Sequence, residues 1–271
     1  MTATTPTRLD RLRLGRVPMI LMYHGVAAAA TAAEDPNHLC VSPARFAEQM
    51  AWLRNRGLRG VSIGELTDAM RAGHAAPRGA AAPRGAAAGS PPRHLVGITF
   101  DDGYLNVLEN ALPVLLRYGF TATMFIVSDR LSGTNEWDEG PSWPLMSAGQ
   151  VAELAAAGME IGSHGATHIR LAGVAPDLLS AEVDGSRSLL TGLLGGPVRG
   201  FAYPYGSMDA AARQAVADAG YDYACAVAAP MTALGMAALP RIYVGERDSA
   251  GRMAVKRLLY RGYIAVRGRK A

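Results

Sequence analysis

Short apolar runs alternate with longer segments in which apolar residues recur every three to four positions, from residue 18 to residue 244. The short runs predict buried strands, and the helical spacing predicts amphipathic helices. The predicted strands are 18–26, 58–61, 95–100, 121–127, 159–163, 199–203, 221–227 and 239–244. The predicted helices between them are 42–56, 62–71, 106–118, 147–158, 176–194 and 209–219. This alternation indicates parallel β-α units and predicts an α/β protein with a barrel-like domain.

Polar residues mark the beginnings of several predicted helices, and glycines mark their ends. Ser62 with Glu65, and Ser147 with Gln150, have the spacing of capping boxes, in which each residue's side chain bonds the other's backbone amide. Glycines that fit the helix C-terminus follow at 57, 119 and 158.

The chain has 271 residues, enough for one large domain with a buried core. Residues 73–93 consist mainly of repeated Ala, Pro, Arg and Gly, which bury little surface. We therefore expect a single domain over residues 1–271, with a flexible low-complexity insertion at about 73–93.

Hydrophobic residues at 49% and charged residues at 18% indicate a globular protein, with a net charge of +4 and a pI near 9.2. Basic residues become dense only at the C-terminus. A solvated face is the favoured interpretation over a contact with nucleic acid or anionic lipid. No nucleic-acid motif accompanies these residues. We expect no nucleic-acid partner, and the oligomeric state stays open. The C-terminal basic residues are Lys256, Arg257, Arg261, Arg267, Arg269 and Lys270.

Cysteine use and the N-terminus bear on the compartment. Cys40 and Cys225 are too few and too far apart for a disulfide framework, which is compatible with a reducing compartment. Basic residues before the apolar run 17–23 have the order of a signal peptide, but the run is short and ends at Tyr23-His24. No run approaches the length of a membrane span. We predict a cytoplasmic protein without a transmembrane segment, with secretion as the less favoured alternative.

Two adjacent carboxylates, Asp101 and Asp102, follow the predicted strand 95–100 and precede Gly103, which allows a sharp turn. Two anionic groups this close repel each other unless they share a proton or a cation. An Asp that merely caps the next helix is the alternative, and the pair alone leaves both open.

His164 and His168 follow the predicted strand 159–163 at a spacing that lets both imidazoles face one point. Such a pair alone is more often structural. Two histidines with one carboxylate form the facial set that holds a divalent metal with open sites for water and substrate. Together with Asp101 and Asp102 they predict a metal site in which the second carboxylate is free to act as a base.

At these residues the sequence resembles the polysaccharide deacetylases, carbohydrate esterase family 4. Thr-Phe-Asp-Asp-Gly at 99–103 is similar to the first motif of that family, and Ser-His-Gly-Ala-Thr-His at 163–168 to the second. Phe-Ala-Tyr-Pro-Tyr-Gly at 201–206 resembles the third motif. The resemblance extends from about residue 20 to residue 243. It implies the fold of this family, a distorted (β/α) barrel similar to a TIM barrel.

The resemblance also implies roles. Asp102, His164 and His168 would hold the metal, with zinc the first choice, although nickel, cobalt or iron would also fit. Asp101, unligated, would be the general base for hydrolysis of an N-acetyl amide, which releases acetate. The backbone amide of Tyr205 would stabilise the negative charge that develops on the carbonyl oxygen.

A histidine that protonates the departing amine comes from a C-terminal Leu-x-His motif in most members, and no histidine follows His168 here. A branch that resembles the poly-N-acetylglucosamine deacetylases carries this histidine near the N-terminus in a Tyr-His motif, which Tyr23-His24 matches. We therefore expect His24 to be the general acid. A histidine satisfied by an ordinary hydrogen bond is the alternative.

The sequence departs from the family pattern at Ala202, where the third motif has an arginine that steadies the base. Arg241 is the candidate replacement, and a surface salt bridge is the equally open alternative. No clear partner orients His24, and Asp222 is a weak candidate. The loop 133–143 contains Trp137, Asp138 and Trp143, which line a sugar cleft or pack as a lid.

The resemblance implies an N-acetylated amino sugar as substrate. Known substrates of the family are chitin oligomers, peptidoglycan, xylan and secreted glucosamine polymers, mostly outside cells. Without a convincing export signal we expect an intracellular substrate, either a small N-acetylated sugar or one on a carrier or metabolite. A related amidohydrolase acting on a non-sugar amide and an inactive sugar-binding member are the alternatives. The retained Asp101 argues against the second.

Overall fold

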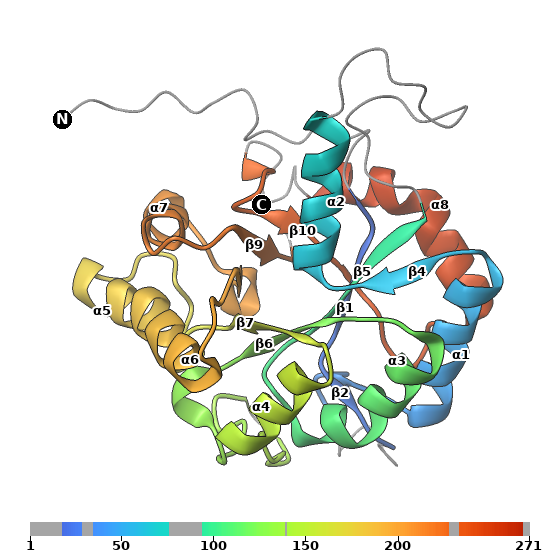
Figure 1. Ribbon diagram of the computed structural model, residues 1–271, viewed down its shortest axis with the longest axis horizontal. Helices are drawn as coiled ribbons and strands as arrows, with labels where there is room; N and C mark the ends of the chain where they lie inside the picture. Colours follow the sequence, from blue (N-terminus) through green and yellow to red (C-terminus); the bar gives the residue numbers. More distant parts are fainter. Residues whose placement is uncertain (1–17, 29–34, 76–93, 139, 228–232, 268–271) are drawn as a thin grey trace.

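A single parallel sheet forms the centre of the protein (Figure 1). The computed structural model describes residues 18–267, except 29–34, 76–93, 139 and 228–232. Within them, nine strands form the sheet in the order β10-β9-β8-β7-β6-β5-β1-β11, with β4 paired to the first half of β5. The strands are β1 (Ile20–Tyr23), β4 (Arg59–Val61), β5 (Leu95–Phe100), β6 (Thr123–Ile126), β7 (Glu160–Ser163), β8 (Gly200–Ala202), β9 (Tyr223–Ala226), β10 (Leu239–Pro240) and β11 (Ile242–Tyr243).

One segment nearly closes this sheet into a barrel. β10 pairs with β9, and β11 pairs with β1 at the opposite edge, so the chain crosses from one edge to the other at Arg241. The predicted single strand 239–244 is thus divided in two at this residue. The closure confirms the predicted distorted (β/α) barrel. A separate small sheet pairs β2 (Gly25–Val26) with β3 (Cys40–Val41).

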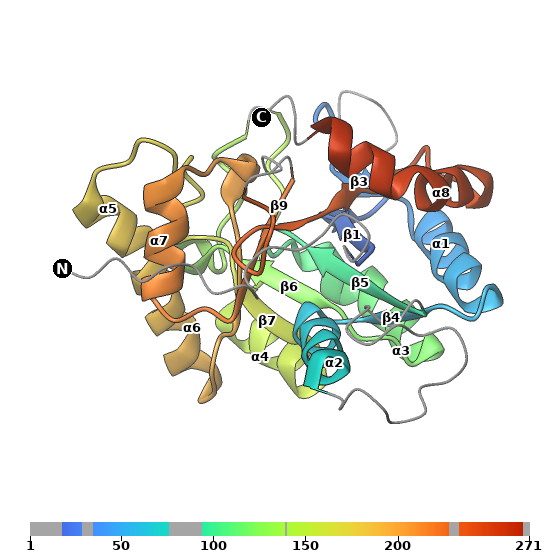
Figure 2. The same cartoon turned by 90° about the horizontal axis from the view of Figure 1, so that it is seen from above.

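Helices surround the sheet, with α5, α6 and α7 on one side of the barrel and α1, α3 and α8 on the other (Figures 1 and 2). The α-helices are α1 (Pro43–Asn55), α2 (Ile63–Ala75), α3 (Leu112–Tyr118), α4 (Ala148–Ala156), α5 (Pro176–Ser180), α6 (Ser186–Leu194), α7 (Ala210–Asp218) and α8 (Ala250–Arg267). Short 3-10 turns occupy Ser128–Arg130 and Pro204–Gly206. None of the described helices is long and apolar enough to cross a bilayer.

The predicted helices 106–118 and 176–194 are present, but each contains a π-helical turn, at Val107–Ala111 and Ala181–Gly185 respectively. The capping box of Ser147 and Gln150 is confirmed. At Ser62 only half of the predicted box forms: its side chain accepts from the Glu65 amide at 3.2 Å, but its own amide donates to Thr121 Oγ1 at 2.9 Å. Thr121 therefore takes the place of the Glu65 side chain as the partner of the Ser62 amide.

Two further differences concern helices α2 and α8. Helix α2 continues to Ala75, past the expected start of the insertion at about residue 73, and the rest of that insertion, 76–93, lies outside the described residues. Helix α8 was not among the predicted helices.

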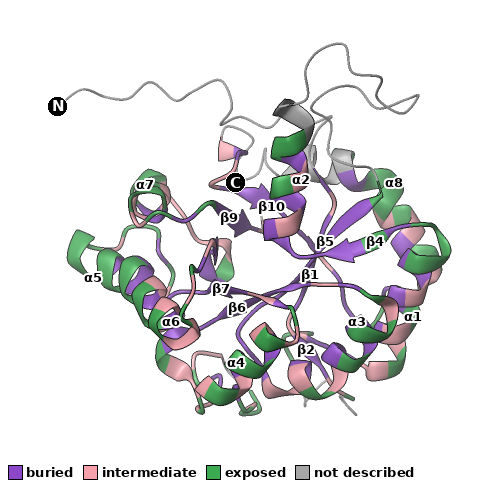
Figure 3. Ribbon diagram, in the orientation of Figure 1, coloured by how far each residue is buried: buried purple, intermediate pink, exposed green. Residues whose placement is uncertain are grey.

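The strands and the inner faces of the helices are buried, and exposed residues lie on the outer helix faces (Figure 3). Strand β5 is buried along its whole length, because both of its faces are covered. Its apolar residues pack against those of α1 and α3 in the main hydrophobic core. The interior thus holds the carboxyl ends of β1, β5, β7 and β8 at one mouth of the barrel, where active sites of such barrels lie.

Candidate metal centre and active site

A cavity of about 210 Å³ opens at this mouth, and six of the seven predicted site residues line it. Each of the six lies at the carboxyl end of a strand or in the loop that follows it. Arg241 lies behind Asp101. The lining residues are Met22, His24, Asn37, Leu39, Asp101, Asp102, Asp138, His164, His168, Tyr203, Tyr205 and Val227.

Three ligand-type side chains converge in the cavity. The Oδ1 atom of Asp102 lies 3.4 Å from Nε2 of His164 and 3.3 Å from Nε2 of His168. All three side chains are buried, and their ligand atoms lie within 4.8 Å of one another. Asp102 Oδ1 has no hydrogen-bond partner among the described residues, which is costly for a buried carboxylate unless a cation is nearby. This donor set fits one divalent metal ion.

The backbone places two of these ligands in an unusual conformation. Asp102 has φ +71° and His168 has φ +69°. These values lie in the left-handed region, a backbone conformation that costs residues other than glycine about 1–2 kcal/mol. Gly103, with φ +81°, completes the turn that directs Asp102 into the cavity. Strain of this kind at two converging ligands indicates a functional site.

His164 is held in the state that metal binding needs. Its Nδ1 atom lies 2.7 Å from the carbonyl oxygen of Ala202. Because a carbonyl oxygen only accepts, Nδ1 carries the proton and Nε2 presents its lone pair to the cavity. Burial lowers the pKa of His164 to about 4, although the charge of Asp101 opposes this shift. The imidazole is therefore neutral at neutral pH.

Asp101 is held apart from the three ligands by Arg241. The guanidinium bonds both carboxylate oxygens, with Nη1 2.5 Å from Oδ1 and Nη2 2.7 Å from Oδ2, and Nη1 also donates to Thr99 Oγ1 at 3.1 Å. Arg241 is fully buried, so the surface salt bridge considered from the sequence is wrong. Its contacts are those expected of a replacement for the arginine missing at Ala202.

For each of the two carboxyls, burial and the neighbouring charges shift the pKa in opposite directions. Burial works to raise the pKa of Asp101, but the charge of Arg241, followed by that of His164, lowers it below its usual range. Burial likewise works to raise the pKa of Asp102, and His168, followed by His24, lowers it well below its usual range. Both groups are ionised at neutral pH, as a metal ligand and a base require.

His24 follows β1 and is half-buried at the cavity. Its Nδ1 atom is buried and has no hydrogen-bond partner among the residues that the structure describes. Asp222, the weak candidate for that role, instead bonds Arg199 Nε at 2.7 Å. Asp222 therefore has a different partner, and the residue that orients His24 stays unassigned.

Tyr205 follows β8 in a tight turn with φ +56°. Its ring lies edge-on to His168, with centroids 4.6 Å apart, and the guanidinium of Arg170 lies 4.3 Å from the ring centre. Its hydroxyl donates to the carbonyl oxygen of Trp137 at 3.4 Å. Burial raises the pKa of Tyr205 to about 12, and the charge of Asp138 adds to the shift, so the hydroxyl keeps its proton.

The loop 133–143 contributes residues to two pockets. Trp137 lies over His168 with ring centroids 4.4 Å apart, and Asp138 lines the cavity. Burial raises the pKa of Asp138, and the charge of Asp102 adds to this effect.

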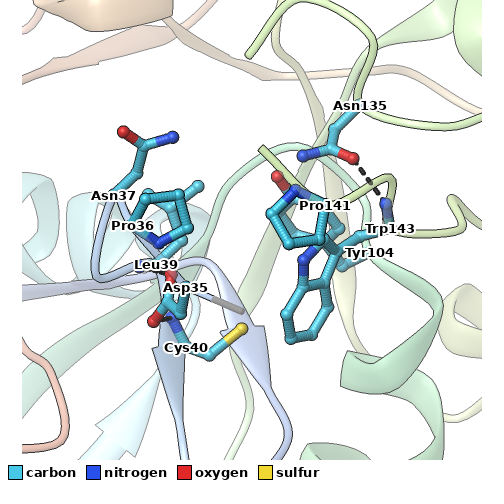
Figure 4. Close-up of a pocket in the computed structure, with 9 residues that line it drawn as sticks. All are labelled: Asp35, Pro36, Asn37, Leu39, Cys40, Tyr104, Asn135, Pro141 and Trp143. Carbon is cyan, nitrogen blue, oxygen red and sulfur yellow. Dashed lines mark hydrogen bonds between the residues drawn. The ribbon is translucent and has the colours of Figure 1, made fainter. Parts of the chain in front are cut away.

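Trp143, from the same loop, packs edge-on against Tyr104 and is not among the residues that line this cavity. It lines a separate pocket of about 10 Å³, between the segment 35–40 and the loop, where its amide donates to Asn135 Oδ1 at 2.6 Å (Figure 4). A space of this size holds about one water molecule. Trp143 is therefore a packing residue, whereas Trp137 and Asp138 belong to the site.

One residue that the sequence analysis missed supports the ligand loop. Glu182 is buried, and its carboxylate accepts from the amides of Ala166 at 2.9 Å and Thr167 at 3.1 Å and from the Thr167 hydroxyl. These bonds hold the loop between His164 and His168. The available signal was an acidic residue on the apolar face of the predicted helix 176–194.

The structure is a distorted (β/α) barrel with a candidate metal site at its mouth. More narrowly, the chain belongs to the polysaccharide deacetylase family, because the model of that family, described as "Polysaccharide deacetylase", matches residues 88–224.

Two curated proteins are similar to this chain in sequence. The Bacillus subtilis (strain 168) protein YxkH is 26% identical over 202 residues, which are 74% of this chain and 61% of that protein. The poly-beta-1,6-N-acetyl-D-glucosamine N-deacetylase of Escherichia coli (strain K12) is 31% identical over 102 residues, 38% of this chain and 12% of that protein. The matches thus span less than two thirds of each relative.

Solved structures share the fold. The Streptococcus pyogenes deacetylase PplD, in complex with acetate, superposes with a TM-score of 0.71 and 22% identity, over 88% of this chain and 97% of that one. IcaB from Ammonifex degensii gives a TM-score of 0.70 and 24% identity, over 89% of this chain and 97% of that one. At these identities the two structures support the barrel fold alone.

Proposed function

We propose that this protein is a metal-dependent hydrolase that removes the N-acetyl group of an amino sugar and releases acetate. The observation that carries the proposal is that the two adjacent carboxylates have different neighbours. Asp102 Oδ1 faces the Nε2 atoms of His164 and His168, whereas both carboxylate oxygens of Asp101 are bonded by Arg241.

Asp102, His164 and His168 would hold the metal. One carboxylate and two imidazoles suit zinc first, and nickel, cobalt or iron also fit. A divalent ion bound there would polarise the acetyl carbonyl and make a nearby water more acidic.

Asp101 is the proposed general base. Its Oδ2 atom lies 4.0 Å from Nε2 of His164, which places it beside the three ligands without joining them. Arg241 keeps the carboxylate ionised and fixes its orientation, so Asp101 is able to accept a proton from the attacking water.

His24 is the proposed general acid. It lines the same cavity from the end of β1, and its charge acts on both Asp101 and Asp102. A protonated His24 would donate to the nitrogen of the departing amine, which is otherwise a very poor leaving group.

The backbone amide of Tyr205 is the proposed donor to the developing oxyanion. Tyr205 has a positive φ, which turns its peptide group at the edge of the cavity. A fixed dipole in such a place stabilises developing charge.

Two observations support a sugar as substrate. The rings of Tyr203 and Tyr205 and the carboxylate of Asp138 line the cavity. Apolar faces next to a hydrogen-bond acceptor suit a sugar ring. The Escherichia coli relative is named for an N-acetylglucosamine polymer. The cytoplasmic location and the single domain remain predictions from the sequence.

Acetate release tests the proposal. Purified protein would be given N-acetylglucosamine, its oligomers, simple amides and cyclic ureides, before and after chelation and after readdition of zinc or cobalt. We expect acetate from an N-acetyl sugar, loss of activity with chelator, and recovery with metal. Release only from non-sugar amides would support the related amidohydrolase, and activity that chelation does not change would contradict the metal assignment.

A further inference from the structure

Helix α8 carries an apolar stripe that nothing in the described chain covers. Val255, Leu258 and Leu259 are 54%, 82% and 57% exposed, and Leu258 is the most exposed large apolar residue described. Their spacing of three and four places them on one helix face. Met253 and Tyr260, on the opposite face, are buried.

The helix is fixed to the barrel, so the stripe is not a frayed end. The hydroxyl of Tyr260 lies 2.7 Å from the carbonyl oxygen of Pro18 and 3.0 Å from that of Pro240. The ammonium of Lys256 donates to the carbonyl oxygen of Tyr243 at 2.7 Å. Tyr243 ends β11 near the mouth and Pro18 precedes β1, so α8 lies along the barrel wall beside α1 (Figure 2).

The charge of this segment is opposite to that of the rest of the chain. Residues 250–271 contain seven Lys and Arg and no Asp or Glu, whereas residues 1–249 contain 20 Lys and Arg against 23 Asp and Glu, a net charge of −3. Arg252 is 63% exposed, and Arg257 is exposed without an ion pair or hydrogen bond to any described residue. The basic charge is thus concentrated in the C-terminal part of the sequence, which includes α8.

We propose that α8 docks the protein on an anionic lipid surface. An amphipathic helix with an exposed apolar stripe and basic side chains lies in the plane of the interface. Its leucines enter the boundary between headgroups and acyl chains, and its basic groups contact anionic headgroups.

Other partners fit less well. Nucleic acid would use the basic groups but leave Leu258 and Leu259 exposed. A second copy bound through the same face would place two strongly basic segments together, and like charges across a symmetric interface are repulsive. A lipid surface satisfies both the apolar stripe and its charge.

Sedimentation of the full-length protein with lipid vesicles tests the proposal. We expect binding to vesicles that contain phosphatidylglycerol, weaker binding at high salt, and little binding to phosphatidylcholine alone. Leu258→Gln with Leu259→Gln should weaken binding by about tenfold or more. Arg257→Gln should weaken it about fivefold, the effect of one basic residue near an anionic surface.

Matched controls separate docking from general surface changes. Leu178→Gln with Leu189→Gln alters leucines that are 50% and 43% exposed on α5 and α6, and Arg117→Gln alters an exposed arginine on α3. These variants should bind vesicles like the unmodified protein, and circular dichroism should show every variant folded.

Three results would overturn the proposal. These are no binding to anionic vesicles, equal loss in the α8 variants and their controls, or a dimer in light scattering that the Leu258 and Leu259 substitutions dissociate without any vesicle binding. The last would identify a second copy as the occupant of the stripe.

Discussion

Replacing Arg241 by methionine should destabilise the protein strongly. Asp101 and Arg241 are at most 3% exposed and share two bonds of 2.5 and 2.7 Å. Removing one member of a buried ion pair leaves the other charge without a partner, at a cost of about 3–5 kcal/mol. Because burial alone works to raise the pKa of Asp101, the loss of Arg241 should also raise the pKa of this carboxyl.

Urea unfolding of the chelated protein, followed by circular dichroism, measures this cost without a contribution from bound metal. Arg199→Met is the matched control, because Arg199 pairs with Asp68 and Asp222 at the surface. Exposed pairs of this kind contribute about 0–1 kcal/mol. Adding Asp101→Asn to Arg241→Met should restore part of the stability, because a neutral amide is less costly to bury than an unpaired carboxylate.

Equal losses in Arg241→Met and Arg199→Met would refute this reasoning. So would a double variant that is less stable than Arg241→Met alone, since it would show that the Asp101 charge is not the source of the cost.

Three further predictions concern residues around the site and one helix cap. Glu182→Ala should weaken metal binding about 10–100-fold, with a smaller loss for Glu182→Gln, as measured by competition with a chromogenic chelator. Asp138→Asn should raise KM for an N-acetyl sugar severalfold with little change in kcat, because Asp138 lines the cavity and is not one of the three residues proposed to hold the metal. Asp209→Ala should cost about 1 kcal/mol in urea unfolding at neutral pH, since the carboxylate caps α7. Bonds from the amides of Ala212 and Gly173 lower the pKa of Asp209. The unmodified protein should therefore be more stable than Asp209→Asn above the ordinary Asp pKa of about 4, and this difference in stability should disappear as pH falls through the lowered pKa of Asp209. An equal loss of stability on acidification in the unmodified protein and in Asp209→Asn would contradict this prediction.

The local sequence pattern was enough to predict most of the strands and helices. Strands β5 and β7 are short runs without helical spacing, and every residue of β5 and all but Glu160 of β7 are buried, because the barrel covers both of their faces. Ser147 with Gln150 identified a helix start that the structure contains. The same strands end in the carboxylates and histidines, so their convergence followed once a parallel barrel was predicted.

Long-range contacts explain what the sequence could not show. Glu182 bonds a loop 15 and 16 residues before it, and Arg241 reaches Asp101 across 140 residues, so neither contact leaves a local pattern. Helix α8 was missed because its apolar residues lie on two faces, with Met253 and Tyr260 toward the barrel and Leu258 outward. A π-helical turn changes the backbone bonding from i→i+4 to i→i+5 over a few residues, and the spacing of apolar residues did not reveal it.

The two carboxylates were visible as a pair, but their separate roles depended on the family resemblance. The structure supports that division through different neighbours. Arg241 occupies both oxygens of Asp101, whereas an oxygen of Asp102 faces two imidazole nitrogens.

The most direct test of this division is a zinc-binding titration of the unmodified protein, Asp101→Asn and Asp102→Asn, paired with acetate release by each. We expect about one metal per chain for the unmodified protein and for Asp101→Asn, with acetate release lost in the latter, and much weaker binding for Asp102→Asn. Full acetate release by Asp101→Asn, or loss of metal from Asp101→Asn while Asp102→Asn keeps it, would show that the two carboxylates do not have these roles.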